Sequence, residues 1–137
     1  MVSISKEVMI SQNLEPVYAM AEQYPKFIGF YKTKEIVHSD ENSSRVKIES
    51  KFCGLKFSWE GKGIKEKNRK IEWIQSKGLL NGMRAEWLFL KSEDKSTRVV
   101  LTVTYSSPVL FWEEVASFLF IRRTVPKILS CLKAACE

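Results

Sequence analysis

Two stretches in which apolar side chains recur at every second residue constrain the fold of this chain more than any other feature. In the segment 83–89 the odd positions are apolar and include Trp87 and Phe89, while Arg84 and Glu86 stand between them. In the segment 97–105 the odd positions from 99 onward again carry apolar or aromatic side chains. A period of two places such side chains on one face of a β-strand. Because residues 91–96 between the segments are all polar, we expect a turn there and an antiparallel hairpin with one apolar face.

Further extended segments and two helical segments flank this hairpin. Asn13 is a good N-cap for a helix that begins at Leu14, and Tyr24-Pro25 should interrupt it because a residue before proline avoids the helical region. Apolar residues recur at helical spacing over 108–135, which predicts a long C-terminal helix that Pro126 kinks or divides. The remaining strands are expected at 3–10, 33–39, 45–52, around 57–59 and at 70–75.

The order of these elements predicts the fold class. Strands grouped between helical segments, without strand–helix alternation, favour an α+β fold over a parallel sheet. We therefore expect a curved antiparallel β-sheet wrapped around a long C-terminal α-helix, with short helices after the first strand. A chain of 137 residues can bury a sizeable core, so residues 1–137 are predicted to form a single domain. The sequence Gly61-Lys62-Gly63 has no strand-to-helix context and is interpreted as a hairpin turn.

Residue types that carry catalysis or bind metals are scarce. The one histidine, His38, lies near a strand end, and its neighbour Ser39 points to the opposite face. Cys131 and Cys136 have an awkward separation for a disulfide on a helix, and no CxxC pair indicates zinc. We therefore expect no catalytic residue, no metal site and no cofactor. Apolar runs are shorter than a membrane span and no signal peptide is recognised, which predicts a cytoplasmic protein, with peripheral membrane association as the alternative.

Aromatic side chains are concentrated on the faces that the alternation turns inward. They either pack as an ordinary core or line a cavity between the sheet and the C-terminal helix, and the residues alone leave both interpretations open. Trp and Tyr suit a lined cavity because each combines apolar area with one hydrogen-bonding atom. The candidate cavity residues are Phe27, Phe30, Phe57, Trp59, Trp73, Trp87, Phe89, Val103 and Tyr105, with Phe118, Leu119 and Arg122 on the helix.

Two cations lie on predicted apolar faces. Lys6 lies on the inner face of the first strand, and Arg122 lies in the apolar stripe of the C-terminal helix. Each is either a rim residue with a buried stem and a hydrated charge, or an internal group that holds a polar ligand. An enzyme could orient a substrate with these two residues, with Tyr105 and, if the strand register differs, with Glu49 or Lys51.

The segment 62–70 concentrates positive charge in a chain whose formal net charge is +6. A basic hairpin tip without aromatic residues suits phosphate, in lipid headgroups or ribosomal RNA, better than it suits stacked bases. The alternative is a solvated turn that keeps the protein soluble. The candidate contacts to an anionic surface are Lys62, Lys65, Lys67, Arg69 and Lys70.

Short motifs spread over nearly the whole chain resemble those of one superfamily. They are Pro16-Val17-Tyr18, Tyr24-Pro25-Lys26-Phe27, Gly54-Leu55, Ile71-Glu72-Trp73, Trp87-Leu88-Phe89, Thr97-Arg98-Val99 and Ser107-Pro108. In their order and spacing, the chain resembles the START-like, polyketide cyclase-like superfamily, which has the helix-grip fold. The resemblance is closest to its coenzyme Q-binding branch, which includes the bacterial ribosome-association toxin.

This resemblance implies non-enzymatic binding or transport of a hydrophobic small molecule in a cavity between the sheet and the C-terminal helix. A lipid, an isoprenoid quinone and a polyketide-like compound are the implied ligands. Two alternatives belong to other classes: an aromatase/cyclase-type enzyme that acts on a polyketide, and a ribosome- or RNA-binding module that uses the basic hairpin. An inward cluster of polar groups would favour the enzyme, and a continuous basic face would favour the module. The sequence does not indicate the oligomeric state.

Overall fold

The structure is a computed structural model of residues 1–137, and it describes residues 1–29, 31–52, 54–78, 80–93, 95–107, 111–117 and 121–137. Its strands are β1 (Val2–Ile10), β2 (Tyr31–Ser39), β3 (Ser43–Phe52), β4 (Leu55–Glu66), β5 (Lys70–Ser76), β6 (Arg84–Lys91) and β7 (Thr97–Tyr105). Its helices are α1 (Leu14–Ala21), α2 (Trp112–Ala116) and α3 (Arg122–Cys136).

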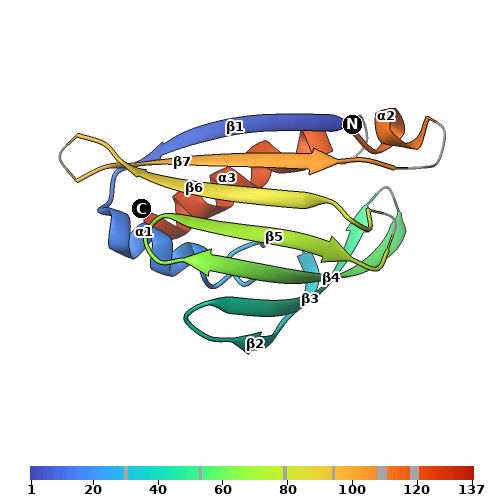
Figure 1. The fold of residues 1–137 in the computed structure, drawn as a ribbon, viewed down its shortest axis with the longest axis horizontal. Helices are drawn as coiled ribbons and strands as arrows, with labels where there is room; N and C mark the ends of the chain where they lie inside the picture. Colours follow the sequence, from blue (N-terminus) through green and yellow to red (C-terminus); the bar gives the residue numbers. More distant parts are fainter. Residues whose placement is uncertain (30, 53, 79, 94, 108–110, 118–120) are drawn as a thin grey trace.

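The strands form one seven-stranded sheet in the order β1-β7-β6-β5-β4-β3-β2, and neighbouring strands are antiparallel. The chain runs along the sheet as a meander from β2 to β7, and β1 closes it by pairing with β7. The sheet curls around α3, and α1 packs beside α3 near the C-terminus (Figure 1). The expected α+β helix-grip fold is therefore confirmed.

The alternation in β6 and β7 places side chains as the sequence predicts. Trp87 and Phe89 on β6 and Leu101 and Val103 on β7 are buried, whereas Arg84 is exposed. The two strands pair so that Trp87 lies opposite Leu101. Their inner side chains therefore form one continuous apolar surface facing α3, the geometry that a sheet with one buried face requires.

The first helix begins at Leu14, as the sequence predicts, and ends ahead of the Tyr24-Pro25 pair that was expected to interrupt it. Asn13 is its N-cap residue, although the Asn13 side chain makes no capping hydrogen bond. The helix ends at Ala21, before Pro25. Val17, Tyr18 and Ala21 are its buried residues. This helix fills the space between β6 and α3 at the end of the sheet away from α2.

The interpretation of Gly61-Lys62-Gly63 as a hairpin turn is wrong. These residues lie within β4, and the reversal between β4 and β5 comes at residues 67–69, where Asn68 has a φ of 58°. The missing side chains of these glycines leave room for Trp73 on the neighbouring strand β5. A Cβ on Gly63 would lie 2.9 Å from Cζ3 of Trp73. Glycine is found in strands where another group approaches the backbone closely, and here that group is the Trp73 indole.

The described part of the C-terminal segment contains the helices α2 and α3, and α3 is not divided at Pro126. Helix α3 continues through Pro126, which lies little more than one turn from its start. The helical pattern changes instead around Ser117 and Ile121, which both have π-helical hydrogen bonding. Val125, Leu129 and Leu132 are buried as the helical spacing predicts, but Val115 on α2 is 40% exposed.

Among the described residues, no group of three or more His, Cys, Asp or Glu side chains is placed to hold a metal ion. Cys131 and Cys136 are free and half-buried on α3. His38 is an exposed residue near the end of β2, where its ring hydrogen-bonds to Asp40. No helix in the described part of the chain is both long and apolar enough to cross a bilayer.

Candidate functional site

A cavity of about 260 Å³ lies between the inner face of the sheet and α3. Its sheet wall comes from strands β2 to β7. Its helix wall comes from Ile121, the N-cap residue of α3, and from Thr124, Val125, Lys127 and Ile128 of α3. Leu80 and Met83, in the connection between β5 and β6, also line it. The cavity is therefore the space that the curvature of the sheet leaves beneath the helix.

The structure brings five of the predicted cavity residues together in this lining. They are Phe57 and Trp59 on β4, Trp73 on β5, Trp87 on β6 and Val103 on β7. All five lie at inward-facing positions of neighbouring strands, which pair in register. These are positions that strand parity turns inward, and their contact with a ligand stays a prediction.

Four predicted residues do not line the cavity. Phe27 packs edge-on against Trp87, with ring centroids 6.4 Å apart. Phe89 packs against Tyr18 of α1 at 5.3 Å, and Tyr105 is buried at the end of β7. These three belong to the ordinary core beside the cavity. Arg122 is exposed, and its Nε donates a hydrogen bond to Oγ of Ser117 at 3.2 Å. The predicted residues Phe30, Phe118 and Leu119 lie outside the described residues.

The three other polar residues considered for an inward position, Lys6, Glu49 and Lys51, lie in different places. Lys6 is exposed on the edge strand β1, which fits the rim interpretation. Glu49 pairs with Lys56 at 3.1 Å. Lys51 is exposed at the end of β3 and does line the cavity, although the sequence favoured it only in a shifted register.

Two tyrosines that the sequence did not assign to the cavity contribute its polar groups. The hydroxyls of Tyr24 and Tyr31 lie 3.2 Å apart, and both residues line the cavity. The Tyr31 ring also packs against Trp59, with ring centroids 5.4 Å apart. The sequence signal was the aromatic density of residues 24–31, but only folding brings the end of the α1 segment against the start of β2.

Both hydroxyls are protonated at neutral pH. Burial raises the pKa of Tyr24 to about 12, against the smaller opposite effect of its hydrogen bond to Tyr31. Burial also raises the pKa of Tyr31 well above 10, and the neighbouring Tyr24 adds to that shift. The pair can therefore donate and accept hydrogen bonds, but it does not supply a phenolate base near pH 7.

The charged residues of the cavity lining are all positive. Among the residues described as lining the cavity there is no Asp, Glu, His or Cys, and the charged residues are Lys51 on β3 and Lys127 on α3. Both lysines are exposed, so their ammonium groups mark the mouth on the sheet side and on the helix side. The interior is therefore neutral and largely apolar, and its entrance is positive.

Four of the five predicted contacts to an anionic surface are at least partly exposed. Lys62 is exposed on the outer face of β4, opposite Arg45 on β3. Lys67 and Arg69 are exposed at the turn, where Arg69 pairs with Glu66 at 3.0 Å. Lys70 is half-buried on β5.

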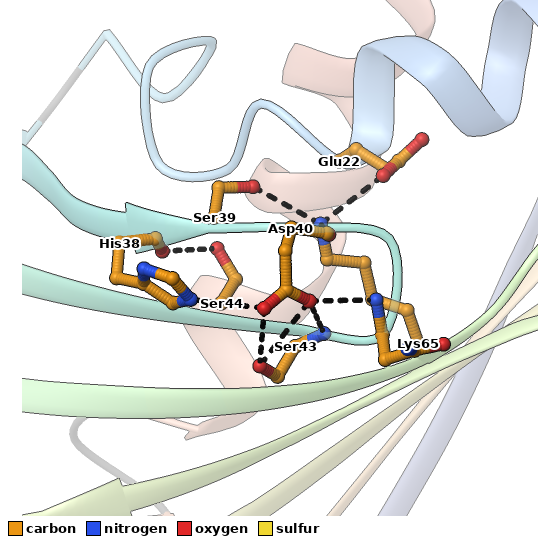
Figure 2. A network of polar contacts seen from close by, with 8 residues as sticks. Glu22, His38, Ser39, Asp40, Ser43, Ser44 and Lys65 are labelled. Carbon is orange, nitrogen blue, oxygen red and sulfur yellow. Dashed lines mark hydrogen bonds and ion pairs between the residues drawn. The ribbon is translucent and has the colours of Figure 1, made fainter.

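Lys65 does not fit the expectation that it contacts an anionic surface. Its side chain points to the inner face of β4 and is 1% exposed. Figure 2 shows its ammonium group held by Glu22 and Ser39, and it also donates to the carbonyl of Asp40. The reason is strand parity, because Lys65 shares the inner face of β4 with Trp59 and Gly63.

Comparison with known proteins identifies relatives of this arrangement. A family model described as "Polyketide cyclase / dehydrase and lipid transport" matches residues 17–133. No curated protein matches the chain. The structure is similar to a protein from Thermus thermophilus, with 20% identity and a TM-score of 0.84 over 98% of this chain and 97% of the other. It is also similar to the Zhui aromatase/cyclase from a Streptomyces species, with 14% identity and a TM-score of 0.84 over 98% and 93%.

A START superfamily protein from Mycobacterium smegmatis has 13% identity and a TM-score of 0.78 over 98% of this chain and 96% of the other. At such identities the solved structures show a shared fold. Nothing in these comparisons supports the narrower resemblance to the coenzyme Q-binding branch or to the ribosome-association toxin.

Proposed function

Since this chain belongs to the polyketide cyclase/dehydrase and lipid transport family, we propose that it binds a hydrophobic small molecule in the cavity beneath α3, as a carrier and not as an enzyme. The observation that carries this proposal is the cavity wall, to which Trp59, Trp73 and Trp87 contribute their indoles. A ligand that removes aromatic surface from water gains about 25 cal/mol per Å² of apolar area before ordering costs are subtracted.

The size of the cavity restricts the ligand. A volume of about 260 Å³ lies just below the range of about 300–1,000 Å³ that is typical of small-molecule sites. It suits a few fused rings or a short acyl chain. A lipid or an isoprenoid quinone would place its ring or the end of its chain inside and leave the rest of the chain at the mouth.

The chemistry of the lining supports a carrier over an aromatase/cyclase. The polar groups inside are neutral hydroxyls, amides and indoles, and the described lining offers no carboxylate or imidazole for proton transfer. The Tyr24–Tyr31 pair is the observation that favours the enzyme, because a neutral phenol can donate a hydrogen bond to a polyketide carbonyl. Without a base beside it, that pair orients a carbonyl better than it removes a proton.

Blocking the cavity tests the proposal. Ala85 lines it on β6, so Ala85→Phe should fill part of the space, whereas Ala134→Phe adds the same group to an exposed position of α3. Binding of an apolar aromatic probe such as fluorene is measured by equilibrium dialysis. We expect the parent and the Ala134→Phe variant to bind fluorene. The Ala85→Phe variant should lose most of its affinity for fluorene.

Native mass spectrometry of protein from its own cells, followed by organic extraction, would then identify the bound compound. If neither fluorene nor any extracted apolar compound binds the parent protein, the carrier proposal is wrong. The cytoplasm remains the expected compartment, and the free thiols of Cys131 and Cys136 are consistent with it.

Contact of the basic hairpin with an anionic surface remains a separate prediction. Its revised form leaves out Lys65, which the fold uses internally. Replacing Lys62, Lys67, Arg69 and Lys70 by Gln should weaken binding to vesicles containing phosphatidylserine, by on the order of 1 kcal/mol per cation near the surface. A parent protein that does not bind such vesicles would show that the hairpin serves solubility alone.

A further inference from the structure

We propose that the cavity takes an amphipathic ligand whose anionic end group, a carboxylate, lies at the mouth between Ser50 of β3 and Lys127 of α3. The apolar part of the ligand then lies deeper, against the indoles of the cavity wall. This inference rests on the proposed function and names the chemistry and the orientation of its ligand. The evidence comes from the polar side chains of the lining, from their places in the fold and from their lack of protein partners.

The hydroxyl of Ser50 is a polar group on the inner face of the sheet that solvent still reaches. Ser50 is 9% exposed, lines the cavity and continues the inward series of Val46 and Ile48 along β3. Its side chain makes no hydrogen bond to another part of the described chain. Among the described residues, the unpaired polar side-chain atoms that are sealed from solvent belong to Tyr18 and Trp73. Oγ of Ser50 is therefore accessible, and the cavity is the side from which it is reached.

Lys127 lies on the same side of the cavity as Ser50. In the sheet, Ser50 pairs with Tyr31 of β2. Burial and the neighbouring Tyr24 raise the pKa of Tyr31 most, and the Cys131 thiol of α3 adds to the rise, so Cys131 lies close to Tyr31. Lys127 precedes Cys131 by four residues, and the two side chains therefore share one side of α3. Tyr31 thus marks the place where the strand of Ser50 and the turn of Lys127 come together.

The lysines of the mouth have no carboxylate partner. Other lysines on the sheet do: Lys47, Lys56 and Lys77 each form an ion pair with a glutamate. Within the described part of the chain, neither Lys51 nor Lys127 forms such a pair, and the described lining contains no Asp or Glu. An anionic group at the mouth therefore meets two cations and no acidic lining residue that would repel it.

A carboxylate uses the hydroxyl and the cation at the same time. One of its oxygens can accept a hydrogen bond from Ser50 while Lys127 attracts its charge from the helix side. Hydrogen bonds to a charged acceptor are stronger than those between neutral groups. At the mouth the carboxylate also keeps part of its hydration, so it avoids the large cost of burying an unpaired charge deep in the cavity. A cationic end group would instead be repelled by Lys127.

Two further polar residues line the cavity, and their positions differ. Thr124 is half-buried on α3 and precedes Lys127 by three residues, so it belongs to the Lys127 side of the mouth. Gln75 lies on β5 opposite Gly61, and β4 separates it from the strand of Ser50. Neither side chain makes a hydrogen bond in the described structure. Thr124 therefore extends the polar end of the cavity, whereas Gln75 meets a different part of the ligand.

The test compares probes that share the fluorene skeleton and differ in one substituent: fluorene-2-carboxylate, fluorene-2-methanol and fluoren-2-ylmethylammonium. Equilibrium dialysis near neutral pH gives the three dissociation constants. We expect the parent to bind the carboxylate roughly tenfold more tightly than the alcohol, and the ammonium compound most weakly. This preference should shrink at high ionic strength, because salt screens the exposed Lys127. The ranking is measured on the parent protein and needs no variant.

Two substitutions then locate the end group. Ser50→Ala should lower the affinity for the carboxylate relative to fluorene by roughly tenfold, and Lys127→Gln should lower it by roughly threefold. Ser130→Ala and Lys133→Gln make the same changes on α3 outside the cavity lining, and both should keep the preference of the parent. Circular dichroism checks that each variant is folded.

The outcomes separate this inference from the proposed function. Equal affinity of the parent for the carboxylate and the alcohol overturns the inference and leaves the proposed function standing. A preference that survives both Ser50→Ala and Lys127→Gln does the same, because the end group would then lie elsewhere. Failure of fluorene and of all three derivatives to bind contradicts the proposed function itself.

Discussion

The ammonium group of Lys65 lies 3.1 Å from the carboxylate of Glu22 (Figure 2). This ion pair joins the end of β4 to the C-terminal end of α1. Lys65 also donates to Oγ of Ser39 at 3.1 Å and to the carbonyl of Asp40 at 2.7 Å. All three ammonium protons thus have acceptors, which is what a buried lysine requires. The contact fastens α1 and the β2–β3 turn to β4, and so helps hold the elements that surround the cavity.

We predict that Glu22→Gln destabilises the protein by about 1–3 kcal/mol, because it leaves the Lys65 ammonium buried without a counter-ion. The expected loss is below that of a fully buried pair because Glu22 itself is 33% exposed. Glu66→Gln breaks the exposed pair with Arg69 and should cost no more than about 0.5 kcal/mol. Urea unfolding compares the two variants. Equal losses would show that burial of Lys65 does not strengthen its dependence on Glu22.

Gly63→Ala should destabilise the protein by about 1–3 kcal/mol, since the added methyl group must displace the Trp73 ring. Gly29→Ala is the matched control: a Cβ there meets nothing within 4 Å, so we expect a change within about 0.5 kcal/mol. Thermal unfolding measures both effects, and near-ultraviolet circular dichroism reports on the tryptophans. An unchanged spectrum and stability for Gly63→Ala would mean that the ring has room that the structure does not show.

The tyrosine pair predicts a loss of stability at alkaline pH. Tyr24 has a pKa of about 12 in the folded protein and about 10 when unfolded, so between these values the unfolded chain releases a proton that the folded chain retains. The contribution of Tyr24 to the free energy of unfolding is thus complete below pH 10 and is lost as the pH rises toward 12. Tyr24→Phe should make the decline of stability over this interval shallower. Parallel declines in the parent and the variant would contradict the raised pKa.

The positive mouth predicts a preference among ligands with ionised ends. Replacing both Lys51 and Lys127 by Gln should weaken binding of the anionic probe 1-anilinonaphthalene-8-sulfonate by roughly 3- to 10-fold, in line with about 0.2–1 kcal/mol for each exposed charge pair. Binding of neutral 9-fluorenone should change little. The control replaces the exposed Lys91 and Lys95, which lie outside the lining, and removes the same net charge. Equal weakening in the control would point to the overall charge and not to the mouth.

The sequence alone predicts the inner face of the sheet. In β6 and β7 the buried positions, such as Trp87, Leu101 and Val103, follow directly from the alternation along each strand. Asn13 and Pro25 likewise bracket the first helix from local signals. These predictions hold because strand and helix periodicity depend on neighbours within a few residues, and the backbone geometry that sets them is the same in every protein.

Tertiary structure decides what the pattern along one strand cannot. In the sequence Gly63 resembles a turn residue, but in the fold it lies against Trp73 of β5. Lys65 resembles a surface cation, but its ammonium group is bound by Glu22, which lies 43 residues away in the sequence. The same holds for the cavity, because its volume is the space left between side chains that come from six strands, α3 and the connections beside them. The sequence determined which face of β6 and β7 is apolar. Only strand register and the position of α3 determined which inward side chains touch each other and which face the empty space.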